Sequence, residues 1–196
     1  DGKTPTGIKL TFKAKHIVLA GGAINNPGLL LRSKAPDPHN RIGKRTTIHP
    51  VNLNMAKMDD SVNPFYGAPQ SIYSDQFQGN TGGDIGFKLE VPPMQPGMGS
   101  QILGLHGLKL MDTLKDLPNL QGTLALMRDG FDEQSQGGTV ELDQGGKPVL
   151  DYPVTDFLWQ GFRKAHHAMA EVQFAAGAKK VMPLHHDADF TTNMKD

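Results

Sequence analysis

The chain of 196 residues contains no cysteine. This absence excludes disulfide bonds, thiol nucleophiles, iron–sulfur clusters and cysteine-ligated zinc, and it leaves the redox environment undetermined. An excess of charge of one sign is lacking as well, because 20 basic residues balance 20 acidic ones. The chain therefore has no overall field that would attract nucleic acid, and we expect no nucleic-acid partner.

Long apolar runs are also missing. No run approaches the roughly 20 residues of a transmembrane helix, so we expect no membrane segment in this chain. The Gly-x-Gly-x-x-Gly pattern of dinucleotide-binding turns and the P-loop pattern are both absent. No metal site is predicted, because the His185-His186-Asp187 run has no third partner at a regular spacing. His166 and His167 are expected to be packed or solvated residues of a helix.

The most distinctive segment is HIVLAGGAINNPGLLLRS, from His16 to Ser33. Its apolar run predicts a buried strand over residues 16–20, and another strand is predicted over residues 8–12. Asn26 is expected to cap a short helix that begins at Pro27, where the missing N–H of proline does no harm.

Small residues separate this predicted strand from the helix. Gly21, Gly22 and Ala23 would let a ligand approach the backbone N–H groups at the positive end of the helix. One interpretation is a turn packed against a nucleotide cofactor. The other, favoured by composition alone, is a tight strand-to-helix connection in which the glycines ease the turn.

Periodicity predicts the remaining elements. Strands are expected over residues 48–55, 85–91, 120–128 and from 179, a hairpin over 138–143 and 148–152, and helices over 98–114 and 156–176. In the last helix an apolar stripe joins Leu158, Phe162, Ala165, Met169, Val172 and Ala176. In the first of these strands Val51, Leu53 and Met55 alternate with Asn52 and Asn54, which is typical of a half-buried strand.

This order of elements predicts an α+β fold. We expect a mainly antiparallel sheet with flanking helices over residues 51–196, and a separate strand–turn–helix piece over residues 1–50. Between residues 61 and 99 the chain is rich in Gly, Pro, Gln, Asn and Ser. The polar residues Gln70, Ser71 and Tyr73 in this stretch are candidates to bind a substrate, although a solvated surface loop explains them equally well.

The segment from His16 to Ser33 resembles the second signature of the glucose–methanol–choline (GMC) oxidoreductases. That signature is an aliphatic strand, Ala-Gly-Ala, two residues, Ser or Thr, Pro, an aliphatic run and Ser-Gly. The chain supplies Gly21-Gly22-Ala23, then Pro27, then Leu29-Leu30-Leu31, then Ser33. It departs at Asn26 and Lys34, where the family has Ser or Thr and Gly.

Further pieces resemble the family in the same order along the chain. Ile42-Gly43-Lys44 with His49-Pro50 is similar to the segment that leads from the flavin domain into the substrate domain. The segments 67–71, 138–152 and 174–178 are similar to a loop, a hairpin and a helix end of the family's substrate domain.

The resemblance implies a function and a cofactor. It implies a flavoenzyme that oxidises an alcohol, sugar or polyol by hydride transfer to FAD, with Gly21, Gly22, Ala23, Asn26 and Pro27 as cofactor-binding residues. Residues 1–50 would be a remnant of the FAD-binding domain and residues 51–196 an incomplete substrate-binding domain.

The resemblance also implies what lies elsewhere. The family's main dinucleotide-binding segment and its catalytic histidine segment have no counterpart in this sequence. We therefore expect a central part of a longer enzyme, with the rest of that polypeptide as a partner. No residue of this chain, His49 at the domain junction included, is assigned as the catalytic base.

Two other functions remain open from the residues alone. The chain could be a self-contained, non-catalytic module that binds a small ligand or a protein. It could also belong to a different nucleotide-dependent enzyme that uses the turn at Gly21 as an anion site. A broad apolar patch around residues 17–31 would favour a piece of a larger fold over a self-contained module.

Overall fold

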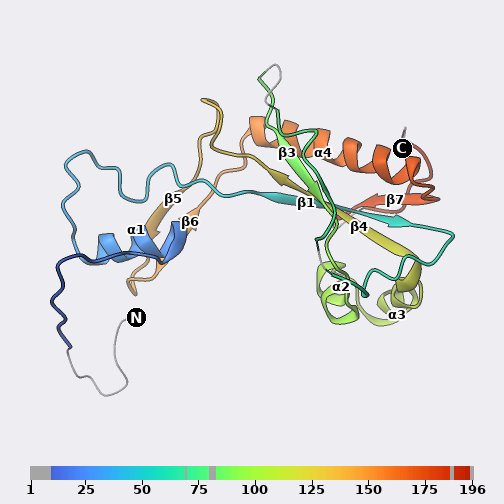
Figure 1. Ribbon diagram of the computed structural model, residues 1–196, viewed down its shortest axis with the longest axis horizontal. Helices are drawn as coiled ribbons and strands as arrows, with labels where there is room; N and C mark the ends of the chain where they lie inside the picture. Colours follow the sequence, from blue (N-terminus) through green and yellow to red (C-terminus); the bar gives the residue numbers. More distant parts are fainter. Residues whose placement is uncertain (1–9, 69, 80–82, 186–187, 195–196) are drawn as a thin grey trace. The chain divides into compact units, whose positions relative to one another are not determined.

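The computed structural model describes residues 10–68, 70–79, 83–185 and 188–194 (Figure 1). The chain forms two compact units. The first unit consists of Asp1–Ile48 and Glu133–Thr155, and the second of His49–Asp132 and Asp156–Asp196. The chain thus leaves the first unit near residue 48 and returns to it for the segment 133–155.

The first unit is built from one helix and one hairpin. Helix α1 (Gly22–Arg32) packs against strands β5 (Thr139–Leu142) and β6 (Pro148–Asp151), which pair with each other in antiparallel fashion. The turn between the strands is closed by Asp143, whose Oδ1 accepts N–H bonds of 2.8 Å from Gly145 and Lys147. The predicted hairpin is therefore present, and it groups with α1 in the first unit.

The second unit is organised around a five-stranded sheet in the order β2-β3-β4-β1-β7, in which every neighbouring pair is antiparallel. Its strands are β1 (Val51–Lys57), β2 (Tyr73–Ser74), β3 (Phe87–Glu90), β4 (Leu120–Met127) and β7 (Lys180–Pro183). The long central pair is in register from Val51 opposite Leu126 to Lys57 opposite Leu120.

Strand β1 is covered on both faces, which corrects the predicted half-buried strand. Met55 is fully buried in an apolar cluster on one face. That cluster contains Met94, Leu103, Leu117 and Leu120. On the other face Asn54 is only 2% exposed, because helix α4 lies over it. The asparagines of β1 thus face a helix and not solvent.

The predicted helix over residues 98–114 is two shorter helices. Helix α2 (Pro96–Ile102) ends before Gly104, and α3 (Gly107–Lys115) follows it. Gly104 and Gly107 have φ values of 58° and 61°, in the left-handed region that interrupts a right-handed helix. A short 3₁₀ helix, η1 (Leu117–Asn119), then leads into β4. Figure 1 shows α2 and α3 on the side of the sheet opposite to α4.

Helix α4 (Asp156–Ala175) confirms the predicted helix to within one residue. Its buried stripe is rotated from the predicted one: Leu158, Ala165 and Met169 are buried, but Gln173 is buried in place of Val172. The helix ends at Gly177, whose φ of 96° allows the N–H of Ala178 to bond the carbonyl of Gln173. These elements together confirm the α+β class.

Candidate functional site

The small-residue turn lies at the start of α1. Gly21 occupies the N-cap position, and no side chain caps the helix there. Gly22 has a φ of 77°, and a Cβ placed on it would meet no heavy atom within 4 Å. Ala23 follows as an exposed residue. The first turn of α1 therefore presents backbone N–H groups to open space, at the positive end of the helix dipole.

Asn26 and Pro27 lie inside α1, so the prediction that they begin the helix is wrong. The Asn26 side chain instead bonds back to the preceding turn: its Oδ1 accepts the Gly21 N–H at 2.7 Å, and its Nδ2 donates to the Leu19 carbonyl at 3.3 Å. Asn26 thus holds the shape of the turn. Pro27 cannot donate the helical bond to the Ala23 carbonyl, because proline has no N–H.

The segment before the turn is apolar and exposed. Ile17 and Val18 are 77% and 85% exposed, and residues 10–20 contain no strand. The predicted strands are therefore wrong for residues 10–12 and 16–20, while residues 8 and 9 lie outside the described part. The reason is physical: nothing within the described residues pairs with this backbone, and a buried-type strand needs neighbours on its edges and faces.

Helix α1 is fixed on the hairpin by close packing. A Cβ on the buried Gly28 would lie 2.7 Å from Cβ of Pro148, so only glycine allows this approach. At the end of the helix, Arg32 donates from Nη1 to the Gly146 carbonyl at 3.1 Å. The position of the small-residue turn is thus set by contacts with β6 and its turn.

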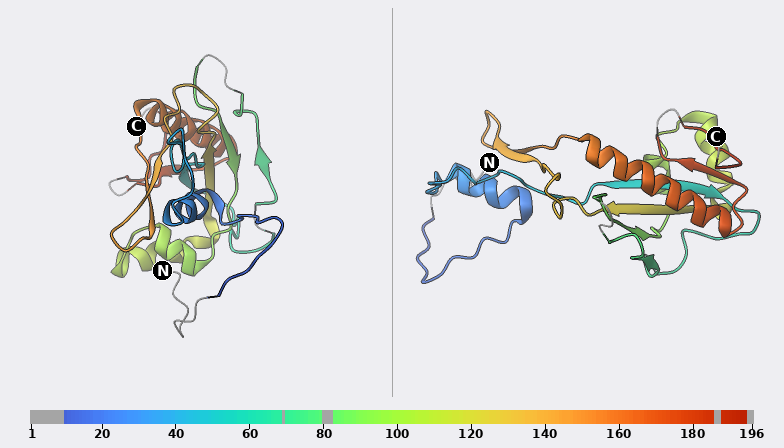
Figure 2. Two further views of the ribbon diagram at one scale, coloured as in Figure 1. Left: turned by 90° about the vertical axis from the view of Figure 1, so that its left-hand side faces the viewer. Right: turned by 90° about the horizontal axis from the view of Figure 1, so that it is seen from above.

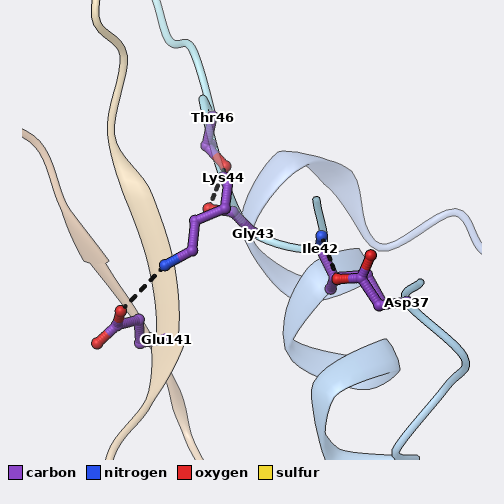
Figure 3. Close-up of polar contacts among 6 residues, drawn as sticks. All are labelled: Asp37, Ile42, Gly43, Lys44, Thr46 and Glu141. Atoms are coloured by element: carbon purple, nitrogen blue, oxygen red, sulfur yellow. Dashed lines mark hydrogen bonds and ion pairs between the residues drawn. The ribbon is translucent and has the colours of Figure 1, made fainter. Parts of the chain in front are cut away.

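A loop after α1 is tied to the same hairpin (Figure 3). The Asp37 carboxylate accepts N–H bonds of 2.8 Å from Arg41 and Ile42, and these two bonds lower the pKa of that carboxyl below its ordinary value. The Lys44 side chain reaches Glu141 on β5, with Nζ and Oε1 3.4 Å apart (Figure 3). Both side chains are largely exposed, so this ion pair contributes little to stability.

The backbone of this loop approaches β5 very closely. Gly43 accepts the Val140 N–H at 2.7 Å, and a Cβ on Gly43 would lie 2.2 Å from the Val140 carbonyl oxygen. Thr46 pairs with Gly138 in an isolated antiparallel bridge. The segment Ile42-Gly43-Lys44, which resembles the family's link between its two domains, therefore joins α1 to the hairpin in this structure.

The candidate substrate residues lie in the second unit and do not converge on one cavity. Gln70 donates from Nε2 to Oε2 of Glu90 at 2.9 Å, and Ser71 donates to the Ala68 carbonyl at 3.3 Å. Tyr73 begins β2, and the ammonium of Lys88 lies 4.1 Å from the centre of its ring. Of the three, Ser71 and Tyr73 line separate cavities of about 270 and 340 Å³.

The cavity beside Tyr73 is the more apolar of these two. Its walls come from β2, β3 and the end of α4, and they include Ile72, Leu89 and Val172. Gln121 and Thr123 supply polar groups from β4. An apolar pocket with a few placed polar groups is typical of a small-molecule site.

A buried polar cluster between α4 and the sheet escaped the sequence patterns. Gln173 is 2% exposed, and its Nε2 donates to Oε1 of Gln121 at 2.9 Å. About two turns closer to the start of α4, Nδ1 of His166 lies 2.6 Å from Oδ1 of Asn54. The sequence feature that could have predicted this cluster is the pair Asn52 and Asn54 in one strand, opposite Gln121 and Thr123 in its partner strand β4.

The described residues contain neither a cluster of metal ligands nor a membrane-spanning helix. Among residues 10–68, 70–79, 83–185 and 188–194, no group of three or more His, Asp or Glu is arranged to hold a metal ion. His186 and Asp187 of the sequence run considered above lie outside these ranges. In the same part of the chain, none of the helices is both long enough and apolar enough to cross a bilayer.

Comparison with known proteins agrees with the motif. Residues 2–51 match the family model described as GMC oxidoreductase. Two proteins of Mycobacterium tuberculosis, from strains CDC 1551 / Oshkosh and ATCC 25618 / H37Rv, are each 30% identical to the chain over 181 residues, and both are described as uncharacterized GMC-type oxidoreductases. The match covers 92% of this chain and 27% of each relative, so the chain spans about a quarter of their length. The chain is a member of the GMC oxidoreductase family.

Proposed function

We propose that this chain is part of a flavin-dependent oxidoreductase that oxidises an alcohol, sugar or polyol by hydride transfer to FAD. The observation that carries the proposal is the turn from Gly21 to Pro27, which lies inside the matched region 2–51. The second unit would act as the substrate domain, and Gln70, Ser71 and Tyr73 remain its candidate substrate residues.

The geometry of the turn suits an anionic cofactor. The helix start is uncapped by side chains, Gly22 leaves space in front of the backbone, and Ala23 is exposed. Gly22 and Ala23 would hold part of FAD through their backbone N–H groups, while the bond from the Gly21 N–H to Asn26 keeps the turn in shape and Pro27 stiffens the helix behind it. When bound, FAD supplies the acceptor for the hydride of a CH–OH group.

The exposed apolar segment before the turn supports a role within a larger fold. Ile17 and Val18 are largely exposed, whereas isoleucine and valine are among the residues most often buried in folded proteins. Covering them with further polypeptide would remove apolar area from water, at about 25 cal/mol for each Å². This feature favours the flavoenzyme proposal over the alternative of a self-contained binding module.

A charge placed at the turn tests the cofactor role. The chain is titrated with FAD, and flavin fluorescence is followed for the unaltered chain, Ala23→Asp and the neutral match Ala23→Asn. An aspartate in the first turn interacts favourably with the helix dipole, so the helix is kept, but its charge repels an anion. We therefore expect Ala23→Asp to bind FAD about tenfold more weakly. Ala23→Asn should bind almost as the unaltered chain does.

Two outcomes contradict the proposal. Equal FAD affinity of Ala23→Asp and Ala23→Asn would show that no anionic part of the cofactor lies at this turn. Absence of saturable FAD binding by the folded chain, together with no alcohol-dependent dye reduction by the polypeptide that contains it, would leave the binding module as the better explanation.

A further inference from the structure

Helix α4 covers only the middle of the sheet in the second unit. A helix with its side chains is about 10–12 Å wide, whereas five strands at about 4.8 Å spacing extend over about 20 Å. The right-hand view of Figure 2 shows α4 lying obliquely over β1 and β4. Grooves therefore remain on both flanks of the helix, and the groove on the β7 flank contains a cavity of about 250 Å³.

The walls of this cavity are mostly apolar. They include Phe174 from α4, Val181 and Pro183 from β7, and Met194 from the segment that follows. Polar lining residues come from β1 and α4 and from the segment after β7, namely Asn54, Arg163, His166, His167, Thr191 and Asn193. The cavity thus combines an apolar body with a polar wall, of which Asn54 and His166 are part, and this combination is typical of a small-molecule site.

The polar wall has a defined hydrogen-bonding character. The Asn54 amide donates from Nδ2 to the His166 carbonyl at 3.0 Å, which directs its Oδ1 toward the ring. Because Oδ1 can only accept, Nδ1 of His166 must carry the hydrogen in the 2.6 Å contact. Burial lowers the pKa of His166 below its ordinary value and so favours the neutral ring.

A neutral ring with its hydrogen on Nδ1 has a free acceptor on Nε2. Nε2 has no hydrogen-bond partner among the residues that the structure describes, and the ring is only partly buried. Arg163, which lies one turn earlier on α4, also lines the cavity and carries N–H donors. A ligand hydroxyl can therefore donate to Nε2 while its oxygen accepts from the guanidinium.

We propose that this cavity is a binding site for a small phenol-like molecule, whose hydroxyl donates to Nε2 of His166 and whose ring packs against Phe174 and Pro183. This site lies on the β7 flank of α4, and the cavity beside Tyr73 lies on the other flank. The inference does not depend on the proposed flavin chemistry, because it uses none of the residues assigned above to FAD or to the substrate.

Two matched probes test the site on the unaltered chain. 4-Fluorophenol has the hydroxyl donor, and 4-fluoroanisole has the same ring with a methyl group in place of that hydrogen. Binding is followed by ¹⁹F NMR titration. Because one hydrogen bond is worth roughly a factor of ten, we expect 4-fluorophenol to bind about tenfold more tightly than 4-fluoroanisole.

Three variants assign the preference to this cavity. His166→Phe removes the acceptor and should make the two probes bind equally. Ala170→Leu fills the cavity from α4 and should weaken both probes. His39→Phe, on the exposed surface of the first unit, is the matched control and should behave as the unaltered chain.

Equal affinity of the two probes for the unaltered chain, or no saturable shift with either, would overturn the proposal without any variant being needed. A preference for 4-fluorophenol that survives in folded His166→Phe would overturn it as well.

Discussion

The side-chain amide of Asn54 holds His166 at two points: Nδ2 donates to the His166 carbonyl at 3.0 Å, and Oδ1 accepts from the ring at 2.6 Å. Asn54 lies in the central strand β1 and is 2% exposed, so both bonds are shielded from water. One buried amide thus links the sheet to α4 and at the same time selects the tautomer of the imidazole.

Removal of this amide should be costly. In Asn54→Ala the ring N–H of His166 loses its partner and the His166 carbonyl loses its second hydrogen bond, so we expect the free energy of unfolding to fall by about 2–4 kcal/mol. Asn52→Ala is the matched control, because among the described residues the Asn52 side chain makes one bond, to the Phe162 carbonyl at 3.1 Å, and its buried Oδ1 has no partner there. Its cost should be about 1 kcal/mol or less. Urea unfolding measures both, and equal losses would contradict the role of Asn54.

Stability should depend on the protonation of His166. Burial, with further effects from His167 and His185, lowers its folded pKa below the ordinary 6.5, so the unfolded chain binds the proton more tightly. The contribution of His166 is therefore complete above the unfolded pKa and is lost as pH falls toward the folded pKa.

Urea unfolding at about pH 7.5 and about pH 5.5 measures this dependence. In His166→Gln the loss of stability between the two values should be smaller than in the unaltered chain. An identical pH dependence in His166→Gln and the unaltered chain would show that this histidine does not titrate as expected.

Close packing of α4 on the sheet requires glycine at position 161. A Cβ there would lie 1.9 Å from Cγ2 of Ile85, so Gly161→Ala should lower the free energy of unfolding by about 1–3 kcal/mol despite the better helix propensity of alanine. Gly97→Ala in α2 is the control, since a Cβ at Gly97 would meet nothing within 4 Å, and it should be stabilising by about 0.5–1 kcal/mol. Thermal or urea unfolding distinguishes the two signs.

The second residue of this contact provides an independent check. Ile85→Ala removes the methyl group that clashes, so its cost should be smaller when Gly161 is already alanine. Strictly additive losses in the double variant would place the strain elsewhere.

The contact between the loop and β5 depends on Gly43. Gly43 and Gly22 have nearly the same φ, 75° and 77°, and an alanine at either position bears about 1–2 kcal/mol of left-handed strain. Only Gly43→Ala would also bring a Cβ to 2.2 Å from the Val140 carbonyl oxygen. We therefore expect faster hydrogen exchange at the Val140 amide in Gly43→Ala and little change there in Gly22→Ala. Similar exchange in both variants would show that the contact is not this close.

Local patterns predicted the elements that are stable through their own periodicity. The helix 156–176 and the strand 120–128 agree with α4 and β4 to within a residue or so, and the glycine-rich turn predicted the hairpin. In each case one face of a regular element, or one turn, contains the information. The family was also evident from the small-residue turn and its flanking motifs.

Other features depended on partners far away in the chain. Residues 16–20 carry the pattern of a buried strand, yet no described strand pairs with them. The helix expected over 98–114 is divided because Gly104 and Gly107 take left-handed conformations. Periodicity predicts which residues share one face of an element, but it does not predict which other element packs against that face.

The sequence by itself determined the family, the α+β class, the hairpin and the position of the longest helix, because these follow from residue order and short-range periodicity. Only the tertiary structure decided that Asn54 and Gln173 lie inside the molecule, that His166 keeps its hydrogen on Nδ1, and that cavities remain on both flanks of α4. The reason is that burial of a polar side chain becomes favourable only when a partner from another element satisfies it, and folding alone brings that partner within reach.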